Sequence, residues 1–391
     1  MRTKLVLVHR YLGLALAGLL FLAGLTGAML AFQRELDAAL NPDLYRAQST
    51  GAILPMDILK TRAEQQLAGA AVVAIQPPWR PGESVMVSVE PSSGAAPLAY
   101  DEAFLDPHNG QMLGKRLWGS CCFERVNLIP FIYKLHFSLH LPGVWGLWIT
   151  GGAAALWTFD CFVALALAAP RRRGVTAWRR VLSIKLRTSD QRRIVDLHRA
   201  PGLWLWAILL IIAATGVGLN LRDQVFAPIV SLFSPVALPI FERPVPAKSL
   251  PERIGFDGAV DRAEQVARSD GRPGTVAHIL YSADLHAYGV ALARTGGDPR
   301  AGLGPDWYYV DTRDGTLRSL ELAGRGSAGD LVMQSRFPLH TGLILGSLGQ
   351  LLVCIAGLAT AILSVTGVAI WARKRRARAN SRHTRTPAAE G

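Results

Sequence analysis

Residues 8–30, VHRYLGLALAGLLFLAGLTGAML, place a histidine at the start of a long apolar run. Residues 197–220, LHRAPGLWLWAILLIIAATGVGLN, repeat the arrangement. In each copy an arginine directly follows the histidine, a glycine stands four residues after it, and a Thr-Gly pair stands 17 and 18 residues after it. The shared spacing indicates one structural element that occurs twice. Its members are His9, Arg10, Gly13, Thr26 and Gly27 in the first copy and His198, Arg199, Gly202, Thr215 and Gly216 in the second.

The composition is that of a membrane protein. Half of the 391 residues are hydrophobic and the mean hydropathy is +0.24, which is too apolar for an ordinary soluble protein of this size. No charge occurs from Tyr11 to Phe32, a length sufficient for a helix to cross a hydrocarbon core of about 30 Å. Similar stretches occupy 144–169, 203–220 and 345–371. We predict four transmembrane helices, the first of them uncleaved because its apolar run exceeds that of a typical signal peptide.

Lysine and arginine are concentrated beside two of these helices. Nine of them lie between Arg171 and Arg193, and seven follow Trp371, against one acidic residue in each segment. The long segments 34–134 and 222–336 are close to neutral. By the positive-inside rule both termini and the first basic segment are cytoplasmic, and the neutral segments lie outside. The basic residues therefore indicate topology and contact with anionic lipid, and they do not indicate a nucleic-acid partner.

A second set of similarities extends the duplication. FLDPHNGQMLG (104–114) resembles YVDTRDGTLRS (309–319), and KLHFSLHL (134–141) resembles PLHTGLIL (338–345). The outer segments contain strand-like and helix-like patterns that predict small α+β units, with Asp-x-x-x-Gly hairpin turns and a Pro-rich connector at 234–251. The predicted fold class is an all-α membrane protein with four transmembrane helices in two repeats, each with one small periplasmic α+β domain. The predicted boundaries are helix one 1–35, outer domain one 36–133, helix two 134–170, basic cytoplasmic loop 171–196, helix three 197–222, outer domain two 223–336, helix four 337–373 and basic cytoplasmic tail 374–391.

Four histidines occupy equivalent ends of the predicted helices. His9 and His198 begin helices one and three on the cytoplasmic side, and His136 and His340 begin helices two and four on the outer side, with His140 one turn further in. Ionisable groups near a bilayer are costly and tend to mark function. Two imidazoles facing each other from two membrane helices are the axial ligands that a b-type haem requires. The sequence therefore predicts two haems b, one in each leaflet.

Small residues on the histidine face support a flat cofactor between helices. Gly13, Gly24 and Gly27 lie within about 60° of His9 on a helix that turns 100° per residue, and Gly202 and Gly216 repeat this in helix three. Helix four is expected to lack such a stripe. Close helix packing is the alternative explanation. A closed zinc site would need more ligands than two histidines.

Three further features stand out, and the first two have two possible roles each. Arg10 and Arg199 are placed to pair with haem propionates or to anchor the helices at the interface. Asp160, within an apolar stretch, either handles protons or forms a structural hydrogen bond to a neighbouring helix. The adjacent Cys121 and Cys122 are candidates for a vicinal disulfide.

Several motifs resemble a known family. HRYLGLALAGLLFLAGLTGAMLAFQRELDAALNP (9–42), the Leu-His pairs at 135–136 and 339–340, and SVTGVAIWARKRR (364–376) resemble the PepSY-associated transmembrane helix family. Some members are siderophore reductases of the ferrioxamine-utilisation type, in the bacterial inner membrane, with four helices, two haems and periplasmic PepSY-like domains. The resemblance implies reduction of a periplasmic ferric siderophore. It also implies that His9 and His198 match the inner haem ligands and that His136 and His340 match the outer ones, with the choice between His136 and His140 left open.

The electron donor must be separate from this chain. The cytoplasmic loop is short and no Gly-rich dinucleotide fingerprint occurs, so the candidates are membrane quinol and a cytoplasmic reductase. Aromatic residues of the outer segments are candidates for the acceptor site. Three other functions remain: a quinol-linked cytochrome that donates to a periplasmic protein, a haem-free PepSY sensor or peptidase regulator, and a transporter. The aromatic candidates are Trp79, Trp118, Phe123 and Trp145.

Overall fold

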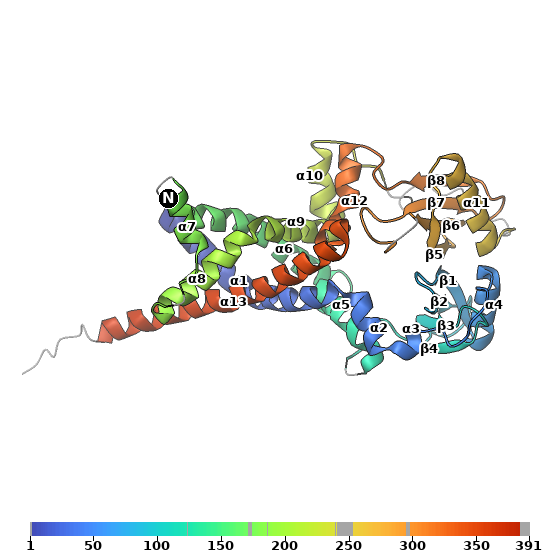
Figure 1. Ribbon diagram of the computed structural model, residues 1–391, viewed down its shortest axis with the longest axis horizontal. Coiled ribbons are helices and arrows are strands. Elements are labelled where there is room, and N and C mark those ends of the chain that lie inside the picture. The colour runs from blue at the N-terminus through green and yellow to red at the C-terminus, as the bar shows by residue number, and fades with distance from the viewer. Residues whose placement is uncertain are drawn as a thin grey trace, which may run out of the picture.

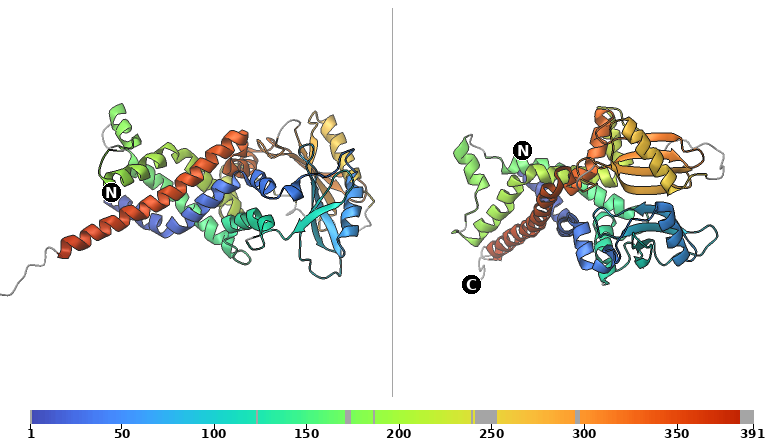
Figure 2. Two further views of the ribbon diagram at one scale, coloured as in Figure 1. Left: turned by 60° about the horizontal axis from the view of Figure 1, so that its bottom comes forward. Right: turned by 45° about the vertical axis from the view of Figure 1, so that its right-hand side comes forward.

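The computed structural model describes residues 2–122, 124–170, 174–185, 187–238, 240, 253–294 and 298–383, without the side chains of 381–383. Figure 1 shows an elongated bundle of helices with a β-sheet and its covering helices at one end. The start of the first helix and the far end of the last helix both lie at the other end of the bundle (Figures 1 and 2). Phe123 and most of the connector predicted at 234–251 lie outside the described residues.

Three long helices are apolar enough to cross a membrane: α1 (Arg2–Leu30), α6 (Trp145–Ala168) and α13 (Gly346–His383). A fourth span exists if α8 (Asp190–Trp204) and α9 (Trp206–Asn220) form one bent unit, since they meet at an angle of 71°. The protein is therefore a membrane protein with three or four candidate spans among its described residues.

The spans α1 and α13 pack closely against each other. A Cβ atom added to Gly24 would lie 2.6 Å from the carbonyl oxygen of Gly357, and one added to Gly357 would lie 2.6 Å from that of Gly24. Only glycine allows the two backbones to come this close. Gly24 thus allows close helix packing, which was the alternative explanation for the small residues on this helix face.

Short helices precede two of the spans and carry two of the histidines. His136 lies in the last turn of α5 (Leu128–Ser138), and His340 lies in the last turn of α12 (Ala328–Thr341). The chain then leaves the helical conformation, at Leu139 and His140 with φ of 53° and 55°, and at Gly342 with φ of 82°. A residue in the left-handed region ends a helix. The expectation that these histidines begin helices two and four was therefore wrong, because each stands on a separate helix before the span.

Strands from the two long segments between the spans share one antiparallel sheet of eight strands, in the order β4-β3-β2-β1-β5-β6-β7-β8. At its centre β1 pairs with β5, with Ala74 opposite Leu280 and Ile75 opposite Ile279. This pairing removes the open edge that each four-stranded unit would otherwise present. The fold is thus mixed α/β, and the all-α class was wrong; the repeat arrangement stays a prediction. The strands are β1 (Ala70–Gln76), β2 (Val85–Pro91), β3 (Glu102–Leu105), β4 (Met112–Arg116), β5 (Thr275–Ser282), β6 (Ala287–Ala293), β7 (Asp306–Asp311) and β8 (Leu317–Glu321).

One face of the sheet is covered by α4 (Met56–Gln66) and α11 (Phe256–Ser269), as Figure 1 shows. Buried side chains of both helices and of the strands form one continuous hydrophobic core, which includes Leu59, Val87, Phe256 and Val290. The predicted hairpin turns are confirmed. Gly110 and Gly315 have positive φ values of 69° and 71° and connect β3 to β4 and β7 to β8.

The two covering helices cap each other. The Asp257 carboxylate accepts hydrogen bonds from the backbone N–H groups of Met56 and Asp57, at 2.8 and 3.0 Å. In return the Asp57 carboxylate accepts from the N–H groups of Phe256 and Asp257, at 2.9 and 3.1 Å. A carboxylate at a helix N-terminus satisfies backbone donors that lack a partner within the helix. The reciprocal pair therefore joins the two outer segments at the start of α4 and α11.

Replacing Asp57 with alanine is expected to destabilise this joint. Loss of a capping side chain costs about 0.5–2 kcal/mol, and this carboxylate serves two donors. The apparent Tm of the purified full chain should fall, with a similar fall for Asp257→Ala. Asp43→Ala is the matched control, since its ion pair with Arg125 is exposed on both sides and exposed pairs contribute little. An equal fall in the control would contradict the assignment.

A buried polar network fixes the sheet to the helices. The Arg116 side chain, 4% exposed, donates to Asp37 on α2 (Gln33–Leu40) at 2.8 Å and to Glu102 at 2.7 Å. The Tyr45 hydroxyl on α3 (Pro42–Tyr45) also donates to Asp37, at 2.7 Å. Burial raises the pKa of the Glu102 carboxyl, and burial with the nearby Asp37 charge raises that of Tyr45. Because α2 follows α1 closely, the network sets the position of the sheet relative to the spans.

The remaining described helices are short. They are η1 (Arg125–Asn127), α7 (Val175–Leu182), the π-helical turn η2 (Arg222–Phe226), α10 (Ala227–Ser231) and η4 (Leu343–Leu345). A disulfide joins Cys121 to Cys122 after β4.

Candidate functional site

Four histidines meet in two pairs inside the bundle. The ring centres of His9 and His198 are 6.1 Å apart, and those of His136 and His340 are 6.2 Å apart. We call His9 and His198 the inner pair and His136 and His340 the outer pair, because α5 and α12 lie at the sheet end of the bundle (Figure 1). The pairs join the partners that the sequence predicted.

The spacing within each pair suits two rings that bind one metal ion. An imidazole–metal bond is about 2 Å long, so two rings on opposite sides of one metal have centres roughly 6 Å apart. Within the described residues no group of three or more His, Cys, Asp or Glu side chains is placed to hold a metal. Each pair thus offers two ligands, which suits the two axial positions of a haem and not a closed zinc site.

Three of the histidines contact a threonine hydroxyl through Nδ1. The pairs are His136 with Thr26 at 2.8 Å, His340 with Thr215 at 3.0 Å, and His198 with Thr366 at 3.0 Å. Each hydroxyl donates its own hydrogen to the backbone carbonyl four residues earlier, at 2.6–2.7 Å. The hydroxyl oxygen is therefore the acceptor, and the Nδ1–H of each ring donates to it. This tautomer leaves the lone pair of Nε2 free for a metal.

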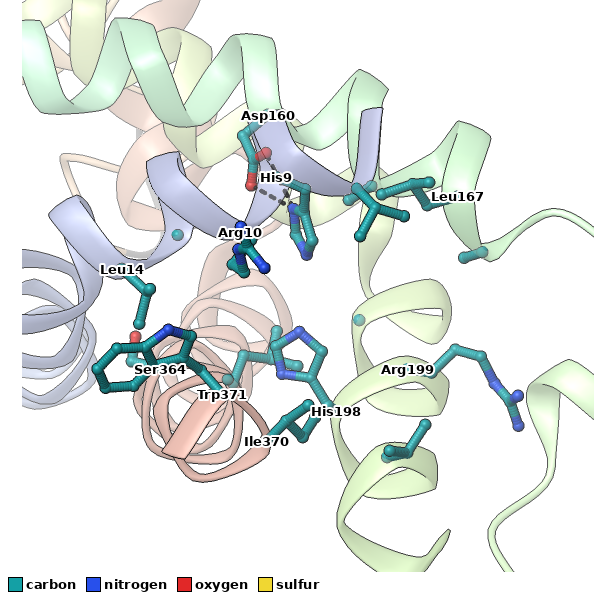
Figure 3. Close-up of a pocket in the computed structure, with 18 of the residues that line it drawn as sticks. His9, Arg10, Leu14, Asp160, Leu167, His198, Arg199, Ser364, Ile370 and Trp371 are labelled. Carbon is teal, nitrogen blue, oxygen red and sulfur yellow. Dashed lines mark hydrogen bonds and ion pairs between the residues drawn. The ribbon is translucent and has the colours of Figure 1, made fainter. Parts of the chain in front are cut away.

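The fourth histidine has a charged partner. Both carboxylate oxygens of Asp160 lie 2.9 Å from Nδ1 of His9, as the dashed lines in Figure 3 show. The carboxylate accepts the Nδ1–H, so His9 also keeps Nε2 free. Of the two roles predicted for Asp160, the geometry shows the hydrogen bond to a neighbouring helix. The donor of this bond is His9, a candidate metal ligand.

A glycine follows each of the three threonines and lies against the same ring. A Cβ atom added to Gly27 would lie 3.1 Å from Cε1 of His136, and one added to Gly216 would lie 3.5 Å from Cε1 of His340. At Gly367 the distance to Cε1 of His198 would be 3.2 Å. A side chain at Gly27 or Gly367 would crowd the ring, whereas one at Gly216 would make an ordinary van der Waals contact with it. In all three pairs the threonine orients the ring, and in two of them the glycine leaves space for it.

Each pair borders a cavity. The first, of about 1010 Å³, is lined by the inner pair, and the second, of about 500 Å³, by the outer pair. Cofactor sites measure about 300–1,000 Å³. Gly13 and Gly202 line the first cavity, and no atom lies within 4 Å of a Cβ added to Gly13. The residues that line both cavities are Leu20, Trp157 and Thr360.

Residues 6–374 match the family described as the PepSY-associated TM region. The chain belongs to the PepSY-associated TM region family. The match extends over nearly the whole chain, including all four paired histidines. A search of curated proteins found no match.

The two arginines beside the histidines differ in this member of the PepSY-associated TM region family. Nε of Arg10 is buried and, within the described part of the chain, has no hydrogen-bond partner. Arg199 pairs with Asp196 at 2.8 Å and donates to two carbonyls of α7. Figure 3 shows the Arg199 guanidinium extending away from the histidines. Arg10 is therefore the arginine available to an anionic group in the first cavity, whereas Arg199 joins α8 to α7.

His136, and not His140, faces His340. Nε2 of His140 lies 2.9 Å from the carbonyl oxygen of Phe131, to which it donates, and its ring stacks on Phe131 with centres 4.2 Å apart. Its imidazole is thus held by another contact. Between the two ligand candidates that the sequence left open, the geometry favours His136.

The aromatic residues predicted for an acceptor site do not share one location. Trp118 lines the second cavity and packs against Tyr133, whereas Trp145 is 62% exposed beside Trp148. Trp79 lies under the guanidinium of Arg34, with 3.9 Å from Cζ to the ring centre. Phe123 lies outside the described residues. The described members thus have different surroundings, and Trp118 alone of these three lines a histidine cavity.

Two members of the site escaped sequence reasoning. Thr366 and Gly367 belong to the motif SVTGVAIWARKRR, from which no role for them followed, and the expectation that helix four lacks the small-residue stripe was wrong. Gly357 packs on Gly24, and Gly367 admits the His198 ring. The available signal was a further Thr-Gly pair in an apolar run, in addition to Thr26-Gly27 and Thr215-Gly216.

Proposed function

We propose that the chain is a membrane oxidoreductase that holds two b-type haems. The inner pair would hold one and the outer pair the other. The observation that carries this proposal is the pairing itself: ring centres 6.1 and 6.2 Å apart, with every Nδ1 engaged and, within the described residues, no hydrogen bond to any Nε2. Bound haem iron supplies one-electron transfer within a medium that excludes ions.

The protein groups around the pairs support this assignment. Thr26, Thr215, Thr366 and Asp160 fix the tautomer and orientation of the four rings, which is the role of groups that hydrogen-bond to metal ligands. The unpartnered Nε of Arg10 can donate to a propionate in the first cavity. The shared lining of Leu20, Trp157 and Thr360 places the cavities next to each other along the bundle.

The proposed substrate is a ferric siderophore, reduced so that its iron is released. The support is the family resemblance together with the large sheet-bearing part beside the outer pair. We propose that the protein lies in the bacterial inner membrane with both termini in the cytoplasm and the sheet in the periplasm. The separation of the basic ends from the sheet along the bundle supports this topology (Figure 2). The donor would be membrane quinol or a cytoplasmic reductase.

The test begins with the purified full chain in detergent. Haem content should be about two per chain, and dithionite should produce the reduced α-band of bis-histidine haem. The reduced protein is then mixed, without oxygen, with ferric ferrioxamine B and a chromogenic ferrous chelator. Oxidation of the haem bands together with formation of the ferrous complex is the expected result.

Other outcomes point to the alternatives. A well-folded preparation that stays colourless after haem addition overturns the haem assignment and favours the sensor or regulator function. Haem that is oxidised by a soluble redox protein but not by ferric ferrioxamine B or other ferric siderophores overturns the substrate assignment. That result would favour a cytochrome that donates to a periplasmic protein.

A further inference from the structure

The four candidate ligands differ in the charge of their Nδ1 partner. Three donate to a neutral hydroxyl, and His9 alone among the four donates to a carboxylate. Given the proposed two-haem function, we infer that Asp160 gives the inner site a lower reduction potential than the outer site, so that transfer of an electron from the inner to the outer site is favoured. Asp160 would be a positioning residue that also sets the direction of electron flow.

The contact is short, and its carboxylate is largely buried. Both carboxylate oxygens lie 2.9 Å from Nδ1, and the Asp160 side chain is 10% exposed. A hydrogen bond to an ionised acceptor is roughly twice as strong as one between neutral groups. A carboxylate that accepts from a ligand imidazole makes the ligand more basic. A more basic, more negative ligand environment stabilises the ferric state over the ferrous state and so lowers the potential.

The hydroxyl contacts have no comparable effect. Each threonine oxygen carries no charge, and its hydrogen is committed to a backbone carbonyl. The two kinds of Nδ1 acceptor occur together in the inner pair. His198 donates to the Thr366 hydroxyl on α13, whereas His9 donates to the Asp160 carboxylate on α6. The difference in acceptor charge between the inner and outer pairs is therefore due to the Asp160 side chain.

Cations near the first cavity act in the opposite direction. Several line it, and four of them, Arg2, Lys374, Arg375 and Arg378, are exposed at its end. Water and salt screen exposed charges, whereas the carboxylate touches the ligand directly. Arg199 is paired with Asp196, which Arg192 also contacts, and its guanidinium extends away from the histidines. Arg10 is the partly buried cation that remains, and a propionate would engage it. We therefore expect the Asp160 contact to outweigh the basic residues.

The transfer itself involves one electron. The inner site is oxidised by one electron and the outer site is reduced by one, and no bond or proton moves in the step. A quinol or a cytoplasmic reductase, as in the proposed function, returns the electron to the inner site, and the ferric substrate removes it from the outer site.

The first test assigns the two potentials in the protein without altering Asp160. Single-haem variants, His136→Ala to keep the inner site and His198→Ala to keep the outer site, are titrated potentiometrically by their α-bands. The lower potential should belong to the inner site. If the outer site has the lower potential, the inference is overturned, although a two-haem protein would still exist. If neither variant contains haem and the native chain contains none, the proposed function fails instead.

The second test removes the charge. Asp160→Asn and Asp160→Thr, the latter copying the Thr366 arrangement, should shift the equilibrium between the sites at least ten-fold toward the inner site. For a one-electron couple this is a rise of about 59 mV in the lower potential. Asp190→Asn removes a carboxylate that is exposed on α8, where it pairs with Arg193, and should leave both potentials unchanged. A lower potential that does not rise in either Asp160 variant, or an equal rise at the outer site, would overturn the inference.

Discussion

Alanine in place of His136 is expected to remove about one of two haems per chain and to leave the inner haem bound. The same result is expected for His340→Ala, because either variant leaves one imidazole where two are needed. Conversely, His9→Ala and His198→Ala should each remove the inner haem only. Haem quantitation and the reduced-minus-oxidised spectrum of each purified variant measure the loss.

His140→Ala is the matched control for this series. It lies four residues from His136, yet its ring donates to Phe131 and not toward His340. We expect both haems to remain. Loss of the outer haem in His140→Ala with retention in His136→Ala would reverse the ligand assignment. Retention of both haems in all four paired-histidine variants would refute it.

Valine in place of Gly27 is expected to exclude the outer haem almost completely. Even a Cβ atom at this position would lie 3.1 Å from Cε1 of His136, and the two γ-carbons of valine need more space than the ring leaves. Repulsion at this distance displaces the ring, and His136 then loses its Thr26 contact as well. Haem content should fall to about one per chain, with the inner spectrum retained.

Gly18→Val on the same helix provides the comparison. No atom lies within 4 Å of a Cβ added to Gly18, so its replacement leaves both histidine pairs in place. Thr26→Val should give a milder defect than Gly27→Val, with haem binding at the outer site about 10–100-fold weaker, because it removes an orienting contact and not a ligand. Equal haem loss in Gly18→Val and Gly27→Val would show that the effect is general instability of the helix.

The pairing of the histidines could be predicted because it depends on periodicity. His9 and His198 stand at equal distances from Thr-Gly pairs in apolar runs, and the positive-inside rule then assigns them to one leaflet. The identity of the Nδ1 partners could not be predicted in the same way. Thr366 and His198 are 168 residues apart, and Asp160 and His9 are 151 apart, so only tertiary packing brings them together.

The boundaries of the membrane-spanning helices were harder to predict from the sequence. Local breaks at Leu139, His140 and Gly342 separate the outer histidines from the long helices, and apolar composition continues through these breaks. The strands and turns were visible from alternation, but the joining of β1 to β5 was not. Strand pairing between segments about 200 residues apart leaves no periodic signal, since any exposed edge of suitable length could serve.

The central β1–β5 pairing also dictates an order of events during synthesis. The ribosome completes β1 long before β5, and the candidate spans α6 and α8–α9 are synthesised between the two strands. Until then β1 is an open strand edge, and α4 lacks the carboxylate that Asp257 will supply. A polypeptide truncated before β5 would therefore be an aggregation-prone fragment, and not a half-sized molecule that functions alone.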